Sequence, residues 1–487
     1  QRLWLSPTSG SCPMAARWPW HWTDLPAETM SNSLEFTEVI GPASSLLGEP
    51  ACGKAFFVGD NRTGVNWGRG ASIALRQLLA SAFEINGCVT GDLFHLSEAE
   101  VAYVGTLMPA RYYRLFQYLL QRRRRRPFGW YIKLEELFGA HDFVVEDPAA
   151  TIDNLLAHKD RYPALARIYD QAREADVLVL DGDGDIIFST PPRRHTLFLL
   201  AMIELGLRLK KPVFLVNSMI SDCPLTGRNA KTLSAARRLF AQCRAVSLRD
   251  PESLEYVRKE MPETAATLIP DSLFSWFPIY SGKDSYPPRN GDFVLPYPEK
   301  DEYWGKLDFS EPYICIGGGA LAGTQPERAA ECYSRLVDAI GQLGYRVCLT
   351  ENDLADSFLQ RIAREKSVGV VPVDAPILLC GAVLAHARLF ISGRYHPSIF
   401  ASLGGTPCIF LESHAHKMGS LSRVLEYETQ QQFSAFPSDS DIAGIVATAR
   451  EYLDRGEELR ERIRRVAKMR CDEAVSLPAF LRSHLND

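Results

Sequence analysis

The sequence has no stretch that approaches the roughly 18 consecutive apolar residues of a membrane-spanning helix. Its first thirty residues contain four tryptophans and several prolines but no continuous apolar run, which is not the pattern of a secretory signal. We therefore expect a poorly ordered N-terminal tail over residues 1–45 and a chain without a transmembrane segment.

Cysteine pairs with the spacing of a zinc or redox site are also missing. The 11 cysteines include no CxxC pair and no cluster with histidine. Several of them, such as Cys315, Cys348 and Cys408, lie within apolar strand-like runs, which is typical of reduced core residues in a cytosolic protein. The cysteines favour a cytoplasmic location and argue against a structural metal site.

A surplus of positive charge is absent as well. Lys and Arg number 54 against 59 Asp and Glu, a formal net charge of −5, which argues against a dedicated nucleic-acid-binding protein. A dense basic run, Arg122 to Arg126, follows the amphipathic segment RYYRLFQYLLQ. Such a run is usually a solvated helix end. The alternative is a peripheral contact with anionic lipid at the inner face of the plasma membrane, or with a polyanionic acceptor.

What the sequence does contain is a repeated alternation of short apolar runs with helix-length amphipathic segments. A chain of 487 residues exceeds the roughly 250 to 300 residues that one core supports, so two domains are expected. The runs AFFVGD, DVLVLDGDGD, PVFLVNS and AVSLRD predict parallel strands of a first lobe over residues 46–280. Residues 281–310 are rich in Pro, Gly, Asp and Tyr and have the composition of a linker.

A second series of runs, YICIGGG, RVCLTEN, ARLFISG and TPCIFLE, predicts another parallel sheet over residues 311–487. The predicted fold class is therefore α/β, with two Rossmann-like lobes. Their arrangement would resemble that of GT-B glycosyltransferases, with an interdomain cleft.

Ligands of open α/β sheets bind beyond the carboxyl ends of the strands, so the residues that follow each run are the candidates. The loop GDNRTGVNWGRGAS contains Asp60, Asn66, Trp67 and Gly68 and leads into a helix whose free N–H groups suit an anion. A plain turn and helix cap is the alternative. We expect Trp67 to stack against a sugar ring.

The loop DGDGD places Asp181, Asp183 and Asp185 after a buried strand. A carboxylate cluster of this kind suits Mg²⁺ or Mn²⁺. The interpretation that we favour is a tight glycine loop in which an Asp accepts sugar hydroxyls, without a metal.

Basic residues follow three later strands. Arg249 ends one strand, and the alternative to a binding role is a surface ion pair. Arg394 and His396 begin a helix after FISG, and Lys417 follows the next strand. Arginine offers a fork for carboxylate or phosphate, and histidine exchanges a proton near neutral pH, although a lone His at a helix start is more often structural.

These elements resemble, in order, the polysaccharide pyruvyl transferase family. NWGRGAS, DGDGD, KPVFLVNS, AVSLRDPES, LIPDSLF and SGRYHPSIFASLGGTPCIF span most of residues 54 to 421. The resemblance implies transfer of the enolpyruvyl unit of phosphoenolpyruvate to a pair of sugar hydroxyls, giving a cyclic pyruvate ketal and phosphate. Arg394 and His396 match the family's R-x-H donor element, and Arg249 matches its earlier arginine. Tyr395 stands where leucine is common.

The residues themselves fit such a reaction, because a donor with a carboxylate and a phosphate needs several fixed cations. We expect His396 to carry protons and Arg249, Arg394, Lys417, Gly317 and Gly318 to line the donor side. Asp60, Asp181 or Asp183 would position the hydroxyl of an acceptor in the first lobe. That acceptor would be a polysaccharide or a lipid-linked sugar, and no cofactor or metal is expected.

Two other functions remain open at this point. The first is a glycosyltransferase that uses a CMP-type nucleotide-sugar, for which GGGALAG at residues 317–323 is the candidate base and ribose pocket. The second is a carbohydrate-binding protein without catalysis, against which the presence of Arg249, Arg394 and His396 argues.

Overall fold

The computed structural model describes residues 51–62, 65–89, 144–160, 163–282, 285–290, 292 and 307–485. The tail predicted for residues 1–45, the basic run at 122–126 and much of the predicted linker lie outside these residues. Within them, no helix has the length and apolar character needed to cross a membrane. All ten cysteines in the described part of the chain are free thiols.

The first lobe is built on a parallel sheet with the strand order β2-β1-β3-β5-β7-β8. The strands β3, β5 and β7 are buried along their whole length, as expected when helices cover both faces of a parallel sheet. The strands are β1 (Lys54–Val58), β2 (Glu84–Val89), β3 (Val177–Asp181), β5 (Val213–Ser218), β7 (Ala245–Leu248) and β8 (Ala266–Leu268).

Helices alternate with these strands, and a small parallel pair, β4 (Ile186–Phe188) and β6 (Ile220–Asp222), stands beside the sheet. Local capping explains where some of them start. The Asp250 side chain accepts a hydrogen bond from the Ser253 N–H, and Pro251 occupies the first helical position of α10. The helices are α2 (Arg69–Ala80), α6 (Pro148–His158), α7 (Pro163–Glu174), α8 (Arg194–Arg208), α9 (Ala230–Phe240) and α10 (Pro251–Glu260).

The second lobe has a parallel sheet with the order β11-β10-β9-β12-β13-β14. Its elements are β9 (Tyr313–Gly319), η6 (Ala322–Thr324), α13 (Pro326–Gly341), β10 (Arg346–Thr350), η7 (Leu354–Asp356), α14 (Phe358–Lys366), β11 (Gly369–Val371), α15 (Ile377–His386), β12 (Leu389–Gly393), α16 (Tyr395–Leu403), β13 (Cys408–Leu411), α17 (Lys417–Val424) and β14 (Gln432–Phe433). The prediction of two Rossmann-like lobes with parallel sheets is confirmed.

Each sheet has a point at which the strand order reverses, and ligands of such sheets bind there. In the first lobe the reversal lies between β1 and β3, so the loops after Val58 and Asp181 flank it. In the second lobe it lies between β9 and β12, so the residues after Gly319 and Gly393 flank it. The predicted site residues thus follow strands at or near both switch points.

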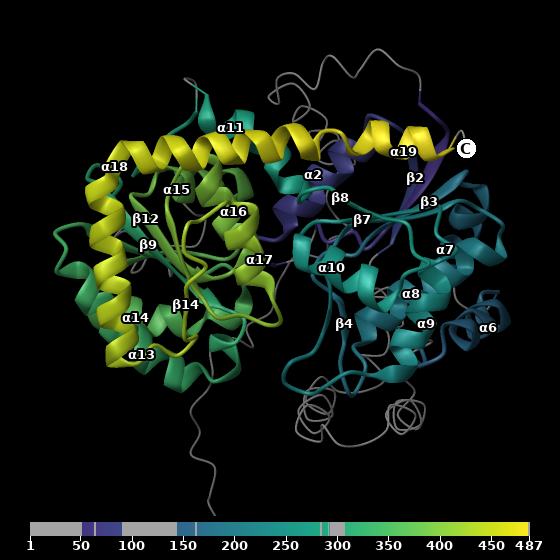
Figure 1. The fold of residues 1–487 in the computed structure, drawn as a ribbon, viewed down its shortest axis with the longest axis horizontal. Helices are drawn as coiled ribbons and strands as arrows, with labels where there is room; N and C mark the ends of the chain where they lie inside the picture. Colours follow the sequence, from purple (N-terminus) through teal and green to yellow (C-terminus); the bar gives the residue numbers. More distant parts are fainter. Residues whose placement is uncertain are drawn as a thin grey trace, which may run out of the picture. The chain divides into compact units, whose positions relative to one another are not determined.

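Several elements pack on the lobe to which they do not belong in sequence. The short helices η4 (Ser272–Trp276) and α11 (Phe277–Ser281) bury side chains in the core of the second lobe, together with residues of α2. The last helices are α18 (Asp439–Ala474), which is kinked at Gly456, and α19 (Leu477–Leu485). The helix α19 follows α18 and contacts α2 (Figure 1). Leu477 and Leu481 of α19 lie in the core of the first lobe, so α19 packs on that lobe.

Candidate functional site

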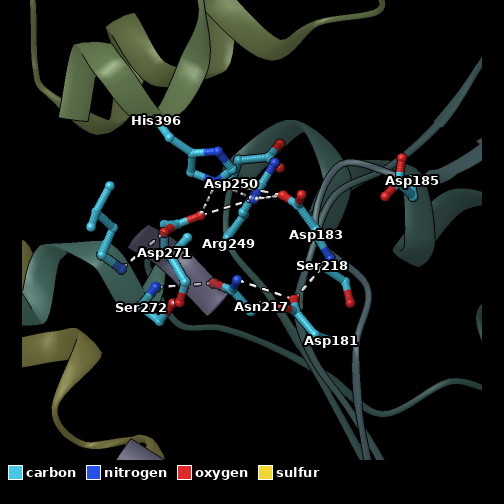
Figure 2. Close-up of polar contacts among 12 residues, drawn as sticks. Asp181, Asp183, Asp185, Asn217, Ser218, Arg249, Asp250, Asp271, Ser272 and His396 are labelled. Atoms are coloured by element: carbon cyan, nitrogen blue, oxygen red, sulfur yellow. Dashed lines mark hydrogen bonds and ion pairs between the residues drawn. The ribbon is translucent and has the colours of Figure 1, made fainter. Parts of the chain in front are cut away.

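Arg249 lies at the centre of a charged cluster where elements of the two lobes meet (Figure 2). It follows β7 and is 1 % exposed, so it is not the surface ion pair that was the alternative. Its Nη1 donates to Asp183 Oδ1 at 2.5 Å and to Asp271 Oδ2 at 2.9 Å. Burial would lower the pKa of Arg249, but the two carboxylates raise it above its usual value. Arg249 is therefore charged.

His396 reaches this cluster from the second lobe, as the second residue of α16. Its Nε2 lies 3.3 Å from Arg249 Nη1, 3.5 Å from Asp183 Oδ1 and 3.4 Å from Asp271 Oδ2. Burial would raise the pKa of Asp183 and of Asp271, but the neighbouring positive charges hold both below the usual value. Both carboxylates are thus ionised and fix the orientation of the imidazole.

Gly68 makes the approach of His396 possible. A Cβ at this position would lie 2.9 Å from His396 Nδ1 and 2.8 Å from Asn66 Oδ1, closer than real Cβ atoms come. The predicted loop residues Asn66 and Gly68 therefore do lie at the site. Their contacts are with the second lobe, since Asn66 also pairs with Asp353 through a β-bridge.

Asp181 supports the loop that carries Asp183. Its Oδ1 accepts from the Asp183 N–H at 3.0 Å and from Asn217 Nδ2 at 3.2 Å. These contacts hold Asp183 and Asn217 in the left-handed region, at φ values of 39° and 52°. Because Asp181 is 3 % exposed, it lies within the protein and is not placed to contact a sugar as predicted. Burial, reinforced by Asp183, raises its pKa well above the usual value.

Lys417 is the first residue of α17. Its ammonium makes no hydrogen bond or ion pair with any residue that the structure describes. It lies over Gly184, where an added Cβ would collide with Lys417 Nζ and lie 3.1 Å from Arg249 Nη2. Burial lowers the pKa of Lys417, while Asp183 and Asp185 act in the opposite direction. Lys417 and the second nitrogen of Arg249 thus face the same glycine.

Arg394 belongs to a separate ion pair. Its Nε donates to Asp356 Oδ2 at 3.1 Å and its Nη2 to Asp356 Oδ1 at 2.6 Å, so this edge of the fork is occupied by the protein itself. A Cβ at Gly318 would collide with Asp356, and one at Gly317 would lie 2.5 Å from Asn352 Oδ1. The two glycines make room for these side chains.

Two residues predicted to hold the acceptor are engaged elsewhere. Asp60 forms a bidentate ion pair with Arg62, with bonds of 2.8 and 2.7 Å. The ring of Trp67 is fully buried in the core that α2 shares with the second lobe. The prediction that Trp67 stacks on a sugar is wrong for this arrangement, because the ring has no free face.

Three residues of the site were not among the predicted ones. Asp271 caps η4 and is fully buried against Arg249, and its signal was its place after a strand in LIPDSLF. Arg193 and His414 make no hydrogen bond or ion pair within the described residues. Burial, together with the charges of Arg193, Lys417 and Arg394, lowers the pKa of His414 to about 4. Arg193, Lys417 and Arg394 therefore all lie close enough to His414 to act on its charge.

The arrangement suits a small anion. Arg249 and Arg394 each bond to carboxylates, whereas Lys417 and Arg193, both half-buried, form no ion pair within the described residues. Removing an unpaired charge partly from water is costly. A ligand with phosphate or carboxylate oxygens would remove that cost. His396, held by ionised groups, is placed to exchange a proton with such a ligand. Within the described residues no group of His, Cys, Asp and Glu side chains is arranged to hold a metal ion.

Comparisons with solved structures give distant similarities. A putative UDP-N-acetylglucosamine 2-epimerase from Listeria monocytogenes is 12 % identical, with 89 % of this chain and 96 % of that chain covered and a TM-score of 0.47. The UDP-GlcNAc 2-epimerase from Neisseria meningitidis is 11 % identical, with coverage of 87 % and 100 % and a TM-score of 0.46. Phytolacca americana UGT2, complexed with UDP-2-fluoro-glucose and pterostilbene, is 11 % identical, with 89 % of this chain and 100 % of that chain covered and a TM-score of 0.46.

The sequence comparison is more specific. No curated protein matches the chain. The family model for polysaccharide pyruvyl transferase matches residues 68–414, which include Arg249, Arg394 and His396. Because this match spans well over half of the sequence, the chain belongs to the polysaccharide pyruvyl transferase family.

Proposed function

We propose that this protein transfers the pyruvyl unit of phosphoenolpyruvate to two hydroxyls of one sugar in a polysaccharide or a lipid-linked oligosaccharide. The observation that carries the proposal is the meeting of Lys417, Arg249 and His396, from two lobes, around one glycine loop. We further propose that the reaction takes place in the cytoplasm and needs neither metal nor cofactor.

The donor's charge would be met by the cations that form no ion pair within the described part of the chain. Phosphoenolpyruvate carries its phosphate on the enol oxygen and its carboxylate on the carbon that bears this oxygen. Lys417 and Arg193 supply positive charge for these two groups. Arg249 adds its Nη2, which faces Gly184, while its Nη1 holds Asp183, Asp271 and His396. This differs from our expectation that Arg394 binds the donor through its fork, since Asp356 occupies the edge formed by Nε and Nη2.

The chemistry balances without an oxidant or reductant. A proton added to the methylene carbon of phosphoenolpyruvate leaves a cationic carbon at the centre. One sugar hydroxyl attacks that carbon and loses its proton, which balances the proton added to the methylene. The second hydroxyl then replaces phosphate, which leaves with the electron pair of its C–O bond and takes up the proton that this hydroxyl loses. The products are a cyclic ketal and inorganic phosphate. The protein must therefore move protons and stabilise phosphate as it leaves.

His396 is our candidate for the proton transfers, because ionised Asp183 and Asp271 and charged Arg249 fix its ring. Asp183 is the carboxylate that we propose for contact with the acceptor, since its side chain remains 29 % exposed whereas that of Asp271 is fully buried. Asp185 stands apart from the cluster in Figure 2 and is within 3.6 Å of His195.

The test is an assay of the purified full-length chain with phosphoenolpyruvate and a panel of aryl glycosides and lipid-linked sugars, in excess EDTA. We expect phosphate release that depends on the acceptor, with a pyruvate ketal detected by mass spectrometry. Transfer from a CMP-sugar, with no use of phosphoenolpyruvate, would replace this proposal by the glycosyltransferase alternative. Binding of the glycosides without turnover of any donor would support a non-catalytic function.

A further inference from the structure

Two helix N-termini, one from each lobe, meet next to the proposed donor site. Arg249 is followed by Asp250, the N-cap of α10, and Lys417 is preceded by His416, the N-cap of α17. His416 Nε2 lies 3.0 Å from Asp250 Oδ1 and 3.2 Å from Ser253 Oγ. Each cap is therefore one residue away from a cation of the site.

The contact continues along both helices, from the first turn of α17 at Ser420 to its last turn at Arg423. Ser420 Oγ is 2.6 Å from Glu252 Oε2 and 3.1 Å from Asp250 Oδ1. Arg423 donates from Nη1 to Glu252 at 2.9 Å and from Nη2 to Glu255 at 3.2 Å. Asp250 and Ser420 are each 1 % exposed, so the centre of the contact is closed to water.

Negative charges are needed where the N-termini of α10 and α17 meet. The N-terminus of a helix carries a partial positive charge, so two of them brought together with Arg249 and Lys417 repel one another. Asp250 at the N-cap of α10 and Glu252 in its first turn offset this repulsion. Although burial would raise the pKa of Asp250, the hydrogen bond and charge of His416 hold it below the usual value.

We infer that the contact between α10 and α17 is a latch, formed by Asp250, Glu252, His416, Ser420 and Arg423, that sets the spacing of Arg249 and Lys417. These are positioning residues, because they act on the donor through the two cations. The inference rests on the proposed function for the identity of the donor. A movement of α17 away from α10 by one or two ångströms would carry Lys417 away from Gly184 and weaken the anion site.

Charge reversal tests the latch. Arg423→Glu places a third carboxylate beside Glu252 and Glu255, and we expect the KM for phosphoenolpyruvate to rise about tenfold while kcat at saturating donor changes by less than about threefold. The double variant Glu252→Arg/Arg423→Glu restores one opposite-charge pair and should recover most of the loss.

Arg208→Glu is the matched control. Arg208 also pairs with two carboxylates, Glu204 and Asp153, and its side chain is 32 % exposed against 35 % for Arg423, but all three residues belong to the first lobe. We expect this control to leave the KM unchanged. An unchanged KM in Arg423→Glu, or no recovery in the double variant, would overturn the latch.

Amide hydrogen exchange separates failure of the latch from failure of the proposed function, because it needs no donor. We expect faster exchange across residues 417–424 in Arg423→Glu and a return toward the wild-type rate in the double variant. If the wild type neither binds nor turns over phosphoenolpyruvate, this exchange result decides the latch by itself. Equal exchange in the wild type and in Arg423→Glu would overturn it.

Discussion

His396 is the side chain whose change should separate chemistry from binding. Its Nε2 lies among Arg249, Asp183 and Asp271, and Arg249 Nη1 bonds directly to both carboxylates, so those bonds do not pass through the imidazole. His396→Asn should lower kcat by on the order of a hundredfold or more, the usual contribution of a positioned acid or base, while the donor still binds. Turnover and calorimetric titration of phosphoenolpyruvate on the same folded variant measure both. A variant with normal kcat would remove His396 from the mechanism.

Gly184 should tolerate no side chain. A Cβ would collide with Lys417 Nζ and approach Arg249 Nη2, so Gly184→Ala displaces the cations of the site. We expect anion affinity to fall about tenfold or more, the equivalent of one weakened charge-assisted bond. Gly341→Ala is the control, because no atom lies within 4 Å of its added Cβ. Equal phosphate affinity in the two variants would contradict the assignment.

His414 makes stability depend on pH. Burial and neighbouring cations lower its pKa to about 4, from an ordinary value near 6.5. The unfolded chain therefore binds the proton first, so this contribution to stability is present above about pH 6.5 and is lost as the pH falls toward 4.

The variant His414→Gln removes this titration. After a discount for partial exposure, the wild type should lose roughly 1 to 2 kcal/mol more unfolding free energy than the variant across that pH range. Sulfate, whose charge is constant there, should reduce the difference. Urea unfolding at several pH values measures it, and parallel curves for the two proteins would show that His414 is not desolvated.

At the scale of elements, α19 ties the end of the chain to the first lobe. Leu481 is fully buried among side chains of that lobe, so Leu481→Ala leaves a cavity. We expect a loss of about 2 to 5 kcal/mol in unfolding free energy, measured by urea denaturation. Leu225→Ala is the control, because Leu225 is 67 % exposed and should cost little. A small effect at Leu481 would mean that α19 does not pack as described.

The strand ends show why much of the site was predictable. Parallel strands of one sheet present their carboxyl ends on one edge, so Asp183 and Arg249 were expected near one another in the first lobe, and His396 and Lys417 in the second. Contacts made across the lobes were not expected, because no local pattern records them. Trp67 looked like a ligand platform, yet α2 packs against the second lobe and buries the ring.

Partners distant in the sequence account for the other differences. Arg394 was assigned to the donor because an arginine after a strand is a good anion ligand, but Asp356 in η7 occupies its Nε and Nη2 from 38 residues away. Arg193 precedes α8 without any motif around it. What marks Arg193 is its missing partner within the described residues, which a sequence cannot show.

For the whole molecule, the central claim is that cations from both lobes bind the donor at a shared site. Calorimetric titration of phosphoenolpyruvate into the wild type, Lys417→Met and Lys468→Met tests it most directly. Lys468 is an exposed lysine that pairs with Asp472 and takes no part in the proposed site, so it serves as the charge-matched control. We predict that Lys417→Met weakens binding by about ten- to a hundredfold, the loss of one charge-assisted bond, and that Lys468→Met binds as the wild type does. Equal binding by all three proteins, or no binding by the wild type, would contradict the account.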